Sequence, residues 1–202
     1  MVSTWAMLVT LSLLGIYAGR HLRGRPSRWQ TVAEWGVGGL SGLIEEMTGE
    51  SGRRYLPLIA TIGLFVLVAN LMAVIPYVEA PTASISTPAA LAVIVFFSVH
   101  YFGVKELGTF GYLRTFAQPS VLLLPMNLIG HLTRTFSLAI RLFGNMLSHQ
   151  IIVAVLLMVL PLVLPAVLEV FGLFIGVLQA YIFTILTIVY IAGAVRAEGG
   201  QA

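Results

Sequence analysis

A long and otherwise apolar segment, residues 120–160, contains an unusual set of polar side chains. They are Asn127, His131, Arg134, Ser137, Arg141, Asn145, Ser148 and His149. At about 100° per residue on a helical wheel, the members of this set from Arg134 onward fall within about 80° of Arg141. A charged side chain at membrane depth costs about 2.5–3.5 kcal/mol on insertion scales, and an arginine does not escape this cost by losing its proton. We therefore interpret Arg141 as a buried charge at the working centre, beside an ion path or an ionisable partner.

The last apolar segment, residues 166–195, contains a single acid, Glu169. Gly172, Gly176 and Gln179 lie within about 80° of Glu169 on the wheel. Glycines allow a neighbouring helix to approach closely, and the glutamine adds a donor and an acceptor. His149 lies near the corresponding end of its own segment, and a histidine exchanges protons near physiological pH. The pattern predicts that His149 and Glu169 meet across a helical hairpin.

Several of these residues also have plainer interpretations. A charge at a helix end can reach the lipid headgroups, and this interpretation suits Arg134 better than Arg141. Gly172 and Gly176 are compatible with ordinary helix packing, and Glu169 with a carboxyl wetted at the outer end of its helix. A passive anchoring protein, however, gives no reason for Arg141 to lie in the middle of a polar stripe.

The composition indicates a membrane protein without covalent chemistry of its own. Of the 202 residues, 58% are hydrophobic and only 9% are charged, whereas soluble domains carry about 25% charged residues. The absence of cysteine excludes disulfides and thiolate metal sites. No metal-ligand cluster, nucleophile triad or phosphate loop is recognisable. We expect no cofactor and no metal, and the small positive charge of +3 does not indicate nucleic acid as a partner.

Apolar runs separated by polar linkers predict an all-α protein with five membrane helices. The predicted spans are residues 2–19, 56–77, 89–104, 120–160 and 166–195. Residues 29–47 mix apolar and polar side chains, which favours an amphipathic helix at the membrane interface. Pro161 and Pro165 separate the last two spans into a long, tilted hairpin.

The predicted organisation is a single membrane domain in three parts. Residues 1–54 form the N-terminal span and a cytoplasmic interfacial segment, residues 55–118 the second and third spans, and residues 119–202 the channel-forming hairpin. Lys and Arg follow the first, third and fifth spans but not the second and fourth. This asymmetry places the N-terminus outside and the C-terminus in the cytoplasm. Because the first arginines come after the first apolar run, that run predicts a span and not a signal peptide.

Three stretches of the chain resemble subunit a of the ATP synthase. Residues 137–146, SLAIRLFGNM, are similar to the arginine signature of that family. Residues 178–187, LQAYIFTILT, resemble its last helix, and residues 68–72, VANLM, followed by Ile75 and Pro76, resemble its second span. The resemblance implies a bacterial inner membrane protein whose partners are a ring of c subunits, b subunits, the rest of the synthase and membrane lipid.

The resemblance also implies a mechanism. Arg141 is then the charge that faces the rotor, and Asn145 and Gln179 line the same interface. An ion enters one half-channel, binds a ring carboxyl, travels around with the ring and leaves by a second, offset half-channel. At about 4 Å, Arg141 would attract an ionised carboxyl by roughly 4 kcal/mol at an effective dielectric near 20, which favours release of its proton. The remaining candidates for the ion path are Ser148, Asn127, His131 and Asn70.

The sequence departs from the family pattern at the positions that usually carry channel acids. Members usually have Glu or His nine residues after the arginine, where this chain has Gln150 with His149 beside it. Seven residues before the glutamine they have His or Glu, where this chain has Gly172, with the acid at Glu169. Asn127 stands where a glutamate is often found. Our hypothesis is that His149 and Glu169 replace the usual pair of the outer half-channel.

Two alternative functions remain compatible with the sequence. The displaced acids leave sodium open as the coupling ion in place of the proton. A small secondary transporter is a more distant alternative, because such a protein is expected to show inverted repeats and broken helices, and neither is visible.

Overall fold

The computed structural model describes residues 5, 7–9, 12, 15, 28–73, 81–117, 122, 124–159 and 163–195. Within these residues the chain forms helices and no β-strand, which confirms the predicted all-α class. The elements are α2 (Arg28–Thr48), the 3-10 helix η1 (Glu50–Arg54), α3 (Leu56–Met72), the 3-10 helix η2 (Pro81–Ala83), α4 (Ser86–Ala117), α5 (Leu124–Val159) and α6 (Val163–Val195). Most of the predicted first span, residues 2–19, lies outside the described residues.

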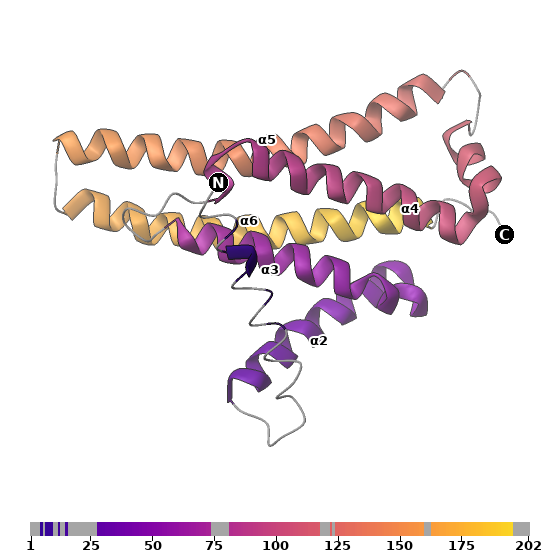
Figure 1. Ribbon diagram of the computed structural model, residues 1–202, viewed down its shortest axis with the longest axis horizontal. Helices are drawn as coiled ribbons and strands as arrows, with labels where there is room; N and C mark the ends of the chain where they lie inside the picture. The colour runs from indigo at the N-terminus through magenta and orange to yellow at the C-terminus, as the bar shows by residue number, and fades with distance from the viewer. Residues whose placement is uncertain are drawn as a thin grey trace.

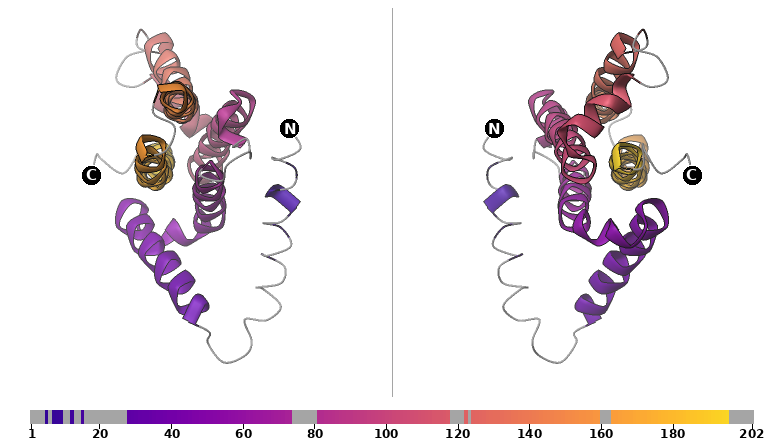
Figure 2. Two further views of the ribbon diagram at one scale, coloured as in Figure 1. Left: turned by 90° about the vertical axis from the view of Figure 1, so that its left-hand side faces the viewer. Right: turned by 90° about the vertical axis from the view of Figure 1, so that its right-hand side faces the viewer.

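Helices α3, α4, α5 and α6 run roughly along the long axis of the molecule, and α2 leaves this bundle at an angle (Figure 1). The end-on views in Figure 2 show α2 leaning away from the other helices. Helix α6 packs against α3, α4 and α5, so it occupies the centre of the bundle. Its side chains Phe183, Ile188 and Ile191 are fully buried, together with Ile59 and Val66 of α3.

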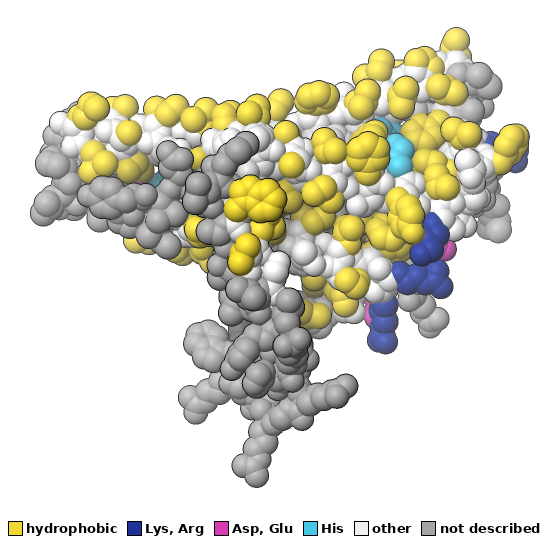
Figure 3. All heavy atoms as spheres, in the orientation of Figure 1, with side chains coloured by type: hydrophobic (Ala, Val, Ile, Leu, Met, Phe, Trp, Pro, Cys, Tyr) yellow, Lys and Arg dark blue, Asp and Glu magenta, His cyan; other side chains and the backbone are white. Residues whose placement is uncertain are grey.

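Among the described residues, three helices are long and apolar enough to cross a membrane: Ser86–Phe116, Leu124–Met158 and Val167–Val195. Helix α3 is apolar but shorter, with 17 residues. Large apolar side chains are exposed over much of the bundle surface, and Figure 3 shows apolar side chains spread along the length of the bundle. A soluble protein rarely exposes so much contiguous apolar surface, so this surface is suited to lipid. These features indicate an integral membrane protein.

The predicted and observed helix boundaries differ most in α4. A polar loop was expected over residues 105–118, but α4 continues through this segment to Ala117. The helical path is broken only locally, at Gly108, where φ is 73° and ψ is 161°. Glycine adopts this left-handed φ without steric cost, which explains why the chain can turn here. The charged residues of the segment therefore lie on a helix and not in a loop.

One of the hairpin helices also begins at another residue than expected. Helix α6 begins at Val163, ahead of the predicted start at residue 166, and α5 begins at Leu124, whereas its predicted start at residue 120 lies outside the described residues. Pro125 and Pro165 each lie in the first turn of a helix. A proline there removes no hydrogen bond, because the first N–H groups of a helix have no partner within it.

Glu106 explains why the charged part of α4 stays helical. Its carboxylate accepts hydrogen bonds from the Tyr55 hydroxyl at 3.2 Å and from Arg54 Nη1 at 3.1 Å. The ring of Tyr55 is fully buried and meets the Phe102 ring edge to face at 4.7 Å. This cluster joins the segment before α3 to the middle of α4.

Tyr55 gives a prediction about pH. Burial, with the neighbouring Glu106 charge, raises the pKa of the Tyr55 phenol to about 12. A phenol that ionises later when folded stabilises the fold below its unfolded pKa of about 10, and this contribution is lost as the pH rises through 12. Absorbance titration of the solubilised protein should show a phenol that ionises near pH 12. The Tyr55→Phe variant should lack that component, and an unchanged titration curve would contradict the assignment.

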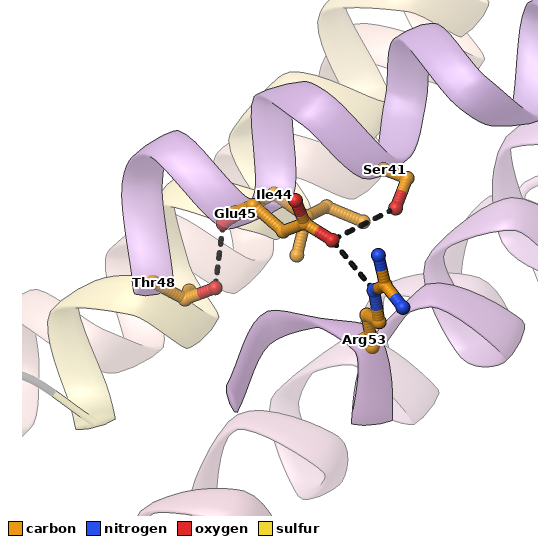
Figure 4. A network of polar contacts seen from close by, with 5 residues as sticks. All are labelled: Ser41, Ile44, Glu45, Thr48 and Arg53. Carbon is orange, nitrogen blue, oxygen red and sulfur yellow. Dashed lines mark hydrogen bonds and ion pairs between the residues drawn. The ribbon is translucent and has the colours of Figure 1, made fainter. Parts of the chain in front are cut away.

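Helix α2 is held to η1 by a carboxylate network (Figure 4). Glu45 Oε1 accepts hydrogen bonds from Arg53 Nε at 2.8 Å and from the Ser41 hydroxyl at 3.4 Å. The hydrogen bond from Arg53 is the main reason that the pKa of Glu45 lies below its usual value. α2 confirms the helix predicted over residues 29–47. Basic side chains gather at this end of the bundle in Figure 3.

Candidate functional site

Arg141 lies on the outer surface of the described bundle. Its side chain is exposed, which corrects the expectation of a buried charge. Within the described residues, Arg141 Nη2 makes a long polar contact of 3.5 Å with the Ser137 hydroxyl. None of the ion pairs among the described residues includes Arg141. The chain therefore presents this charge outward instead of neutralising it.

The apolar side of α5 fixes this orientation. Leu138, Leu142 and Met146 are spaced four residues apart and are 2%, 1% and 6% exposed. Residues at this spacing share a helix face, so the three side chains anchor that face in the bundle. Arg141 and Ser148 lie beside this anchored face and remain exposed.

Asn145 joins the polar stripe of α5 to α6. Its Nδ2 donates a hydrogen bond of 2.7 Å to Gln179 Oε1. Gln179 is 4% exposed, whereas Asn145 is exposed. The predicted pair of amides is thus assembled across the hairpin, one helical turn beyond Arg141.

His149 and Glu169 meet across the same hairpin, as their positions suggested. His149 Nε2 lies 3.6 Å from Glu169 Oε2, which is within ion-pair distance but too long for a hydrogen bond. Both atoms are buried, and neither has a hydrogen-bond partner among the described residues. Buried polar atoms normally have a hydrogen-bond partner, and a bridging water or uptake of a proton would supply one for this pair. The arrangement is therefore suited to exchange protons.

Gly172 makes room for the His149 ring. A Cβ added at Gly172 would lie 2.3 Å from His149 Cε1, closer than real Cβ contacts. The expected acid or histidine at position 172 could not coexist with this ring placement. The departure from the family pattern at position 172 thus has a steric reason. The plainer packing interpretation suits Gly176, whose Cβ would meet Asn70 Cβ at 3.1 Å.

A cavity of about 220 Å³ surrounds these groups, and we call it the His149 chamber. Its polar lining comprises Asn70, Asn145, Ser148, His149 and Gln179. The chamber is large enough for several water molecules, each of which occupies about 30 Å³ in the liquid. It contains five of the residues predicted for the ion path, and Glu169 lies at 3.6 Å from one of them.

Asn70 has a structural role in this chamber. Its Nδ2 donates to the Gly176 carbonyl at 3.0 Å, and its Oδ1 accepts from the Thr82 hydroxyl at 3.3 Å. Asn70 and Thr82 are 2% and 0% exposed. The side chain therefore joins α3, η2 and α6 where the helices approach closely.

We expect Asn70→Ala to destabilise the subunit. The change leaves the buried Gly176 carbonyl and Thr82 hydroxyl without this partner, at a cost of about 1–3 kcal/mol. Thermal unfolding of the subunit in the detergent-solubilised complex measures the effect. Thr61→Ala is the control, because the exposed Thr61 hydroxyl bonds only its own helix, at the Pro57 carbonyl. Equal melting of Asn70→Ala and Thr61→Ala would contradict this role.

The polar residues near the start of α5 form a second group. Asn127 Nδ2 donates to the Phe116 carbonyl at 2.9 Å, which ties the start of α5 to the end of α4. The His131 ring lies against Phe116 and against His100, with ring centroids 5.0 and 5.7 Å apart. Arg134 lies over the Tyr190 ring at 6.0 Å. Sequence analysis missed His100, because nothing in its own apolar helix marks it.

The sequence of the chain is similar to known proteins over nearly its whole length. Residues 1–192 match the family described as ATP synthase A chain. The chain belongs to the ATP synthase A chain family. It is 45% identical over 194 residues to ATP synthase subunit a 2 of a Bradyrhizobium species, covering 96% of this chain and 87% of the relative. It is 47% identical over 197 residues to ATP synthase subunit a 1 of Chlorobaculum parvum, with 96% and 87% covered.

Membership in the ATP synthase A chain family confirms the resemblance drawn from the arginine and glutamine segments. The Chlorobaculum tepidum ATP synthase subunit a 1 is 46% identical over 197 residues, with 96% of this chain and 89% of the relative covered. The similarity thus extends over nearly the whole chain and is not confined to the polar hairpin. The roles of single side chains in the ion path stay predictions.

Proposed function

We propose that this chain is the stator subunit a of a rotary F-type ATP synthase and couples transmembrane proton flow to rotation of a c-subunit ring. The observation that carries the proposal is Arg141, a permanent charge exposed on a membrane-spanning helix without an ion-pair partner among the described residues. Exposing such a charge to lipid is costly. A partner surface that brings carboxylates to Arg141 removes that cost.

Arg141 acts on each passing ring carboxyl as a fixed charge. It attracts the ionised form, so a carboxyl that arrives protonated tends to give up its proton as it approaches. It also repels a free cation, which prevents ions from crossing directly between the two half-channels. Asn145 and Gln179, already paired at 2.7 Å, line the interface beside it.

The polar groups on either side of Arg141 support two separate half-channels. His149 lies about 12 Å from Arg141 along α5, and His131 about 15 Å in the other direction, at 1.5 Å per residue. The His149 chamber, with His149, Ser148 and Glu169, serves as the outer half-channel. Asn127 and His131 belong to the opposite one. The charge between the groups keeps their ions apart.

The proposed assembly follows from this placement. The c-ring faces the exposed stripe of α5, and b subunits, the rest of the synthase and lipid surround the remaining surface. The N-terminus lies outside and the C-terminus in the cytoplasm of a bacterial inner membrane, in keeping with the loop charges. Residues 119–202 form the channel, and residues 1–54 and 55–118 support it as parts of one membrane domain.

The coupling ion gives a direct test. We expect purified complex in proteoliposomes to make ATP from a proton gradient equally well with and without sodium, because His149 and Glu169 exchange protons. The measurement compares ATP synthesis in sodium-free and sodium-containing buffer. A requirement for sodium, with synthesis that survives a protonophore, would favour the sodium-translocating alternative. No ATP synthesis under either gradient would reject the proposed function.

A further inference from the structure

His100 and His131 form a histidine pair that the ion path described above does not use as a unit. His100 comes from α4 and His131 from α5, and their rings meet at 68° with centroids 5.7 Å apart. His100 Nδ1 lies 2.7 Å from the Phe96 carbonyl, so this nitrogen carries a hydrogen and donates it. The other nitrogen of His100, Nε2, is then the one free to bind a proton.

A small cavity of about 20 Å³ touches both histidines, and we call it the His131 cavity. The polar side chains in its lining are His100, His131, Arg134, Thr135 and Tyr190. A cavity above about 10–15 Å³ holds a water molecule when two or more polar groups bind it. The His131 cavity has room for one water, and polar side chains line it.

The His131 cavity lies on a different side of Arg141 from the His149 chamber. His131 precedes Arg141 by ten residues and His149 follows it by eight on the same helix. Leu138 lines the His131 cavity and Leu142 lines the His149 chamber, and both are buried between them. These two buried apolar side chains separate the cavities on the buried side of α5.

We propose that His100 and His131, bridged by one water, form the proton relay of the half-channel opposite the His149 chamber. The proposal rests on the proposed function and names the residues of its second half-channel. A hydronium in the cavity gives a proton to a free ring nitrogen and becomes water. The ring then gives a proton to the next water on the path and returns to its neutral form. Charge and atoms balance, and the relay carries protons only.

The groups around the pair suit a transient proton. Arg134 is the charged side chain that faces it from α5, and Tyr112 and Tyr190 face it from α4 and α6 without charge. A fixed cation beside the relay keeps a second positive charge from resting there. The rings of Phe96 and Phe116 pack against the His100 ring.

The test is passive proton conduction through membranes from which the catalytic head has been stripped. His100→Gln and His131→Gln keep hydrogen-bonding groups but cannot take up a proton. We expect each to lower conduction by about a hundredfold, the low end of what a positioned acid–base side chain contributes. Because glutamine does not titrate, both variants should also change the dependence of conduction on pH. Ser98→Ala on α4 is the control, because the exposed hydroxyl bonds only the Ile94 carbonyl of its own helix.

The possible results distinguish the histidine relay from the proposed function on which it rests. Conduction is scaled to the amount of assembled a and c subunits, and His131→Asn replaces His131→Gln if that variant assembles poorly. Wild-type conduction with an unchanged pH profile in both histidine variants would overturn the relay. The proposed function then still stands if Arg141→Ala loses coupling. Retained coupling in Arg141→Ala would remove the proposed function and this relay together.

Discussion

Replacing Arg141 with alanine should abolish ATP-driven proton pumping while the complex still assembles. The change removes an attraction of roughly 4 kcal/mol for a ring carboxylate at 4 Å, which corresponds to about a thousandfold in rate. Assembly should survive because the side chain is exposed and makes only the 3.5 Å contact to Ser137 within the described chain. Acidification of inverted membrane vesicles, followed with a fluorescent pH probe, measures pumping.

Two further variants sharpen this experiment. Arg141→Lys keeps a positive charge but loses the planar guanidinium, so partial pumping would show that charge alone does part of the work. Arg114→Ala also removes one exposed arginine from a long helix, but near the end of α4, and should pump normally. Pumping by Arg141→Ala at the level of Arg114→Ala would contradict the proposed role.

The second large effect is expected at the His149–Glu169 pair. His149→Ala, Glu169→Ala and the double variant should each lower pumping by about a hundredfold, the low end for loss of a positioned proton-transfer group. Because the two groups lie 3.6 Å apart and act as a unit, the double variant should be little worse than either single one. Pumping rates of all three variants, scaled to assembled complex, give the coupling directly. Undiminished pumping in the double variant would contradict a role of the His149–Glu169 pair in proton transfer.

Gly172→Ala tests the same pair without removing either member. The new Cβ would come within 2.3 Å of the His149 ring and must displace it from Glu169. We expect pumping to fall toward the level of His149→Ala. Gly193→Ala is the matched control on α6, since a Cβ there meets nothing within 4 Å. Equal pumping by the two alanine variants would show that the ring position does not matter.

The sequence was sufficient for the features that depend on local pattern. Apolar runs located α3, α5 and α6 to within a few residues, and a mixed run located α2, because helix formation follows periodicity along the chain. The His149–Glu169 meeting also followed, since a short hairpin brings matching positions of two helices together. The sequence pattern did not predict that α4 continues past residue 104. The carboxylate of Glu106 there is paired with Arg54 and accepts a hydrogen bond from Tyr55, and only the fold determines the positions of these partners.

Two sequence-based expectations, one about Arg141 and one about His100, failed for the same physical reason. The helical wheel grouped Arg141 with its polar neighbours but could not say which face of α5 meets the bundle, so the exposed arginine was expected to be buried. His100 was missed because the residues that pair it with a second histidine and a cavity come from other helices. Which helix faces touch is set by packing between segments, and the pattern of one segment does not contain it.

The hydrogen bond between Asn145 and Gln179 has one more consequence. It uses a single donor of Asn145 and one acceptor site of Gln179, so donors and lone pairs remain on both amides. A neutral carboxylic acid needs one partner that donates and one that accepts, whereas a carboxylate needs donors only. We propose that the exposed Asn145 amide, held by the buried Gln179, receives a ring carboxyl in either state, one helical turn from an arginine that favours only the ionised state. In the proposed mechanism, Arg141 would therefore set when the carboxyl changes state, and the amides would let it leave in the state it has acquired.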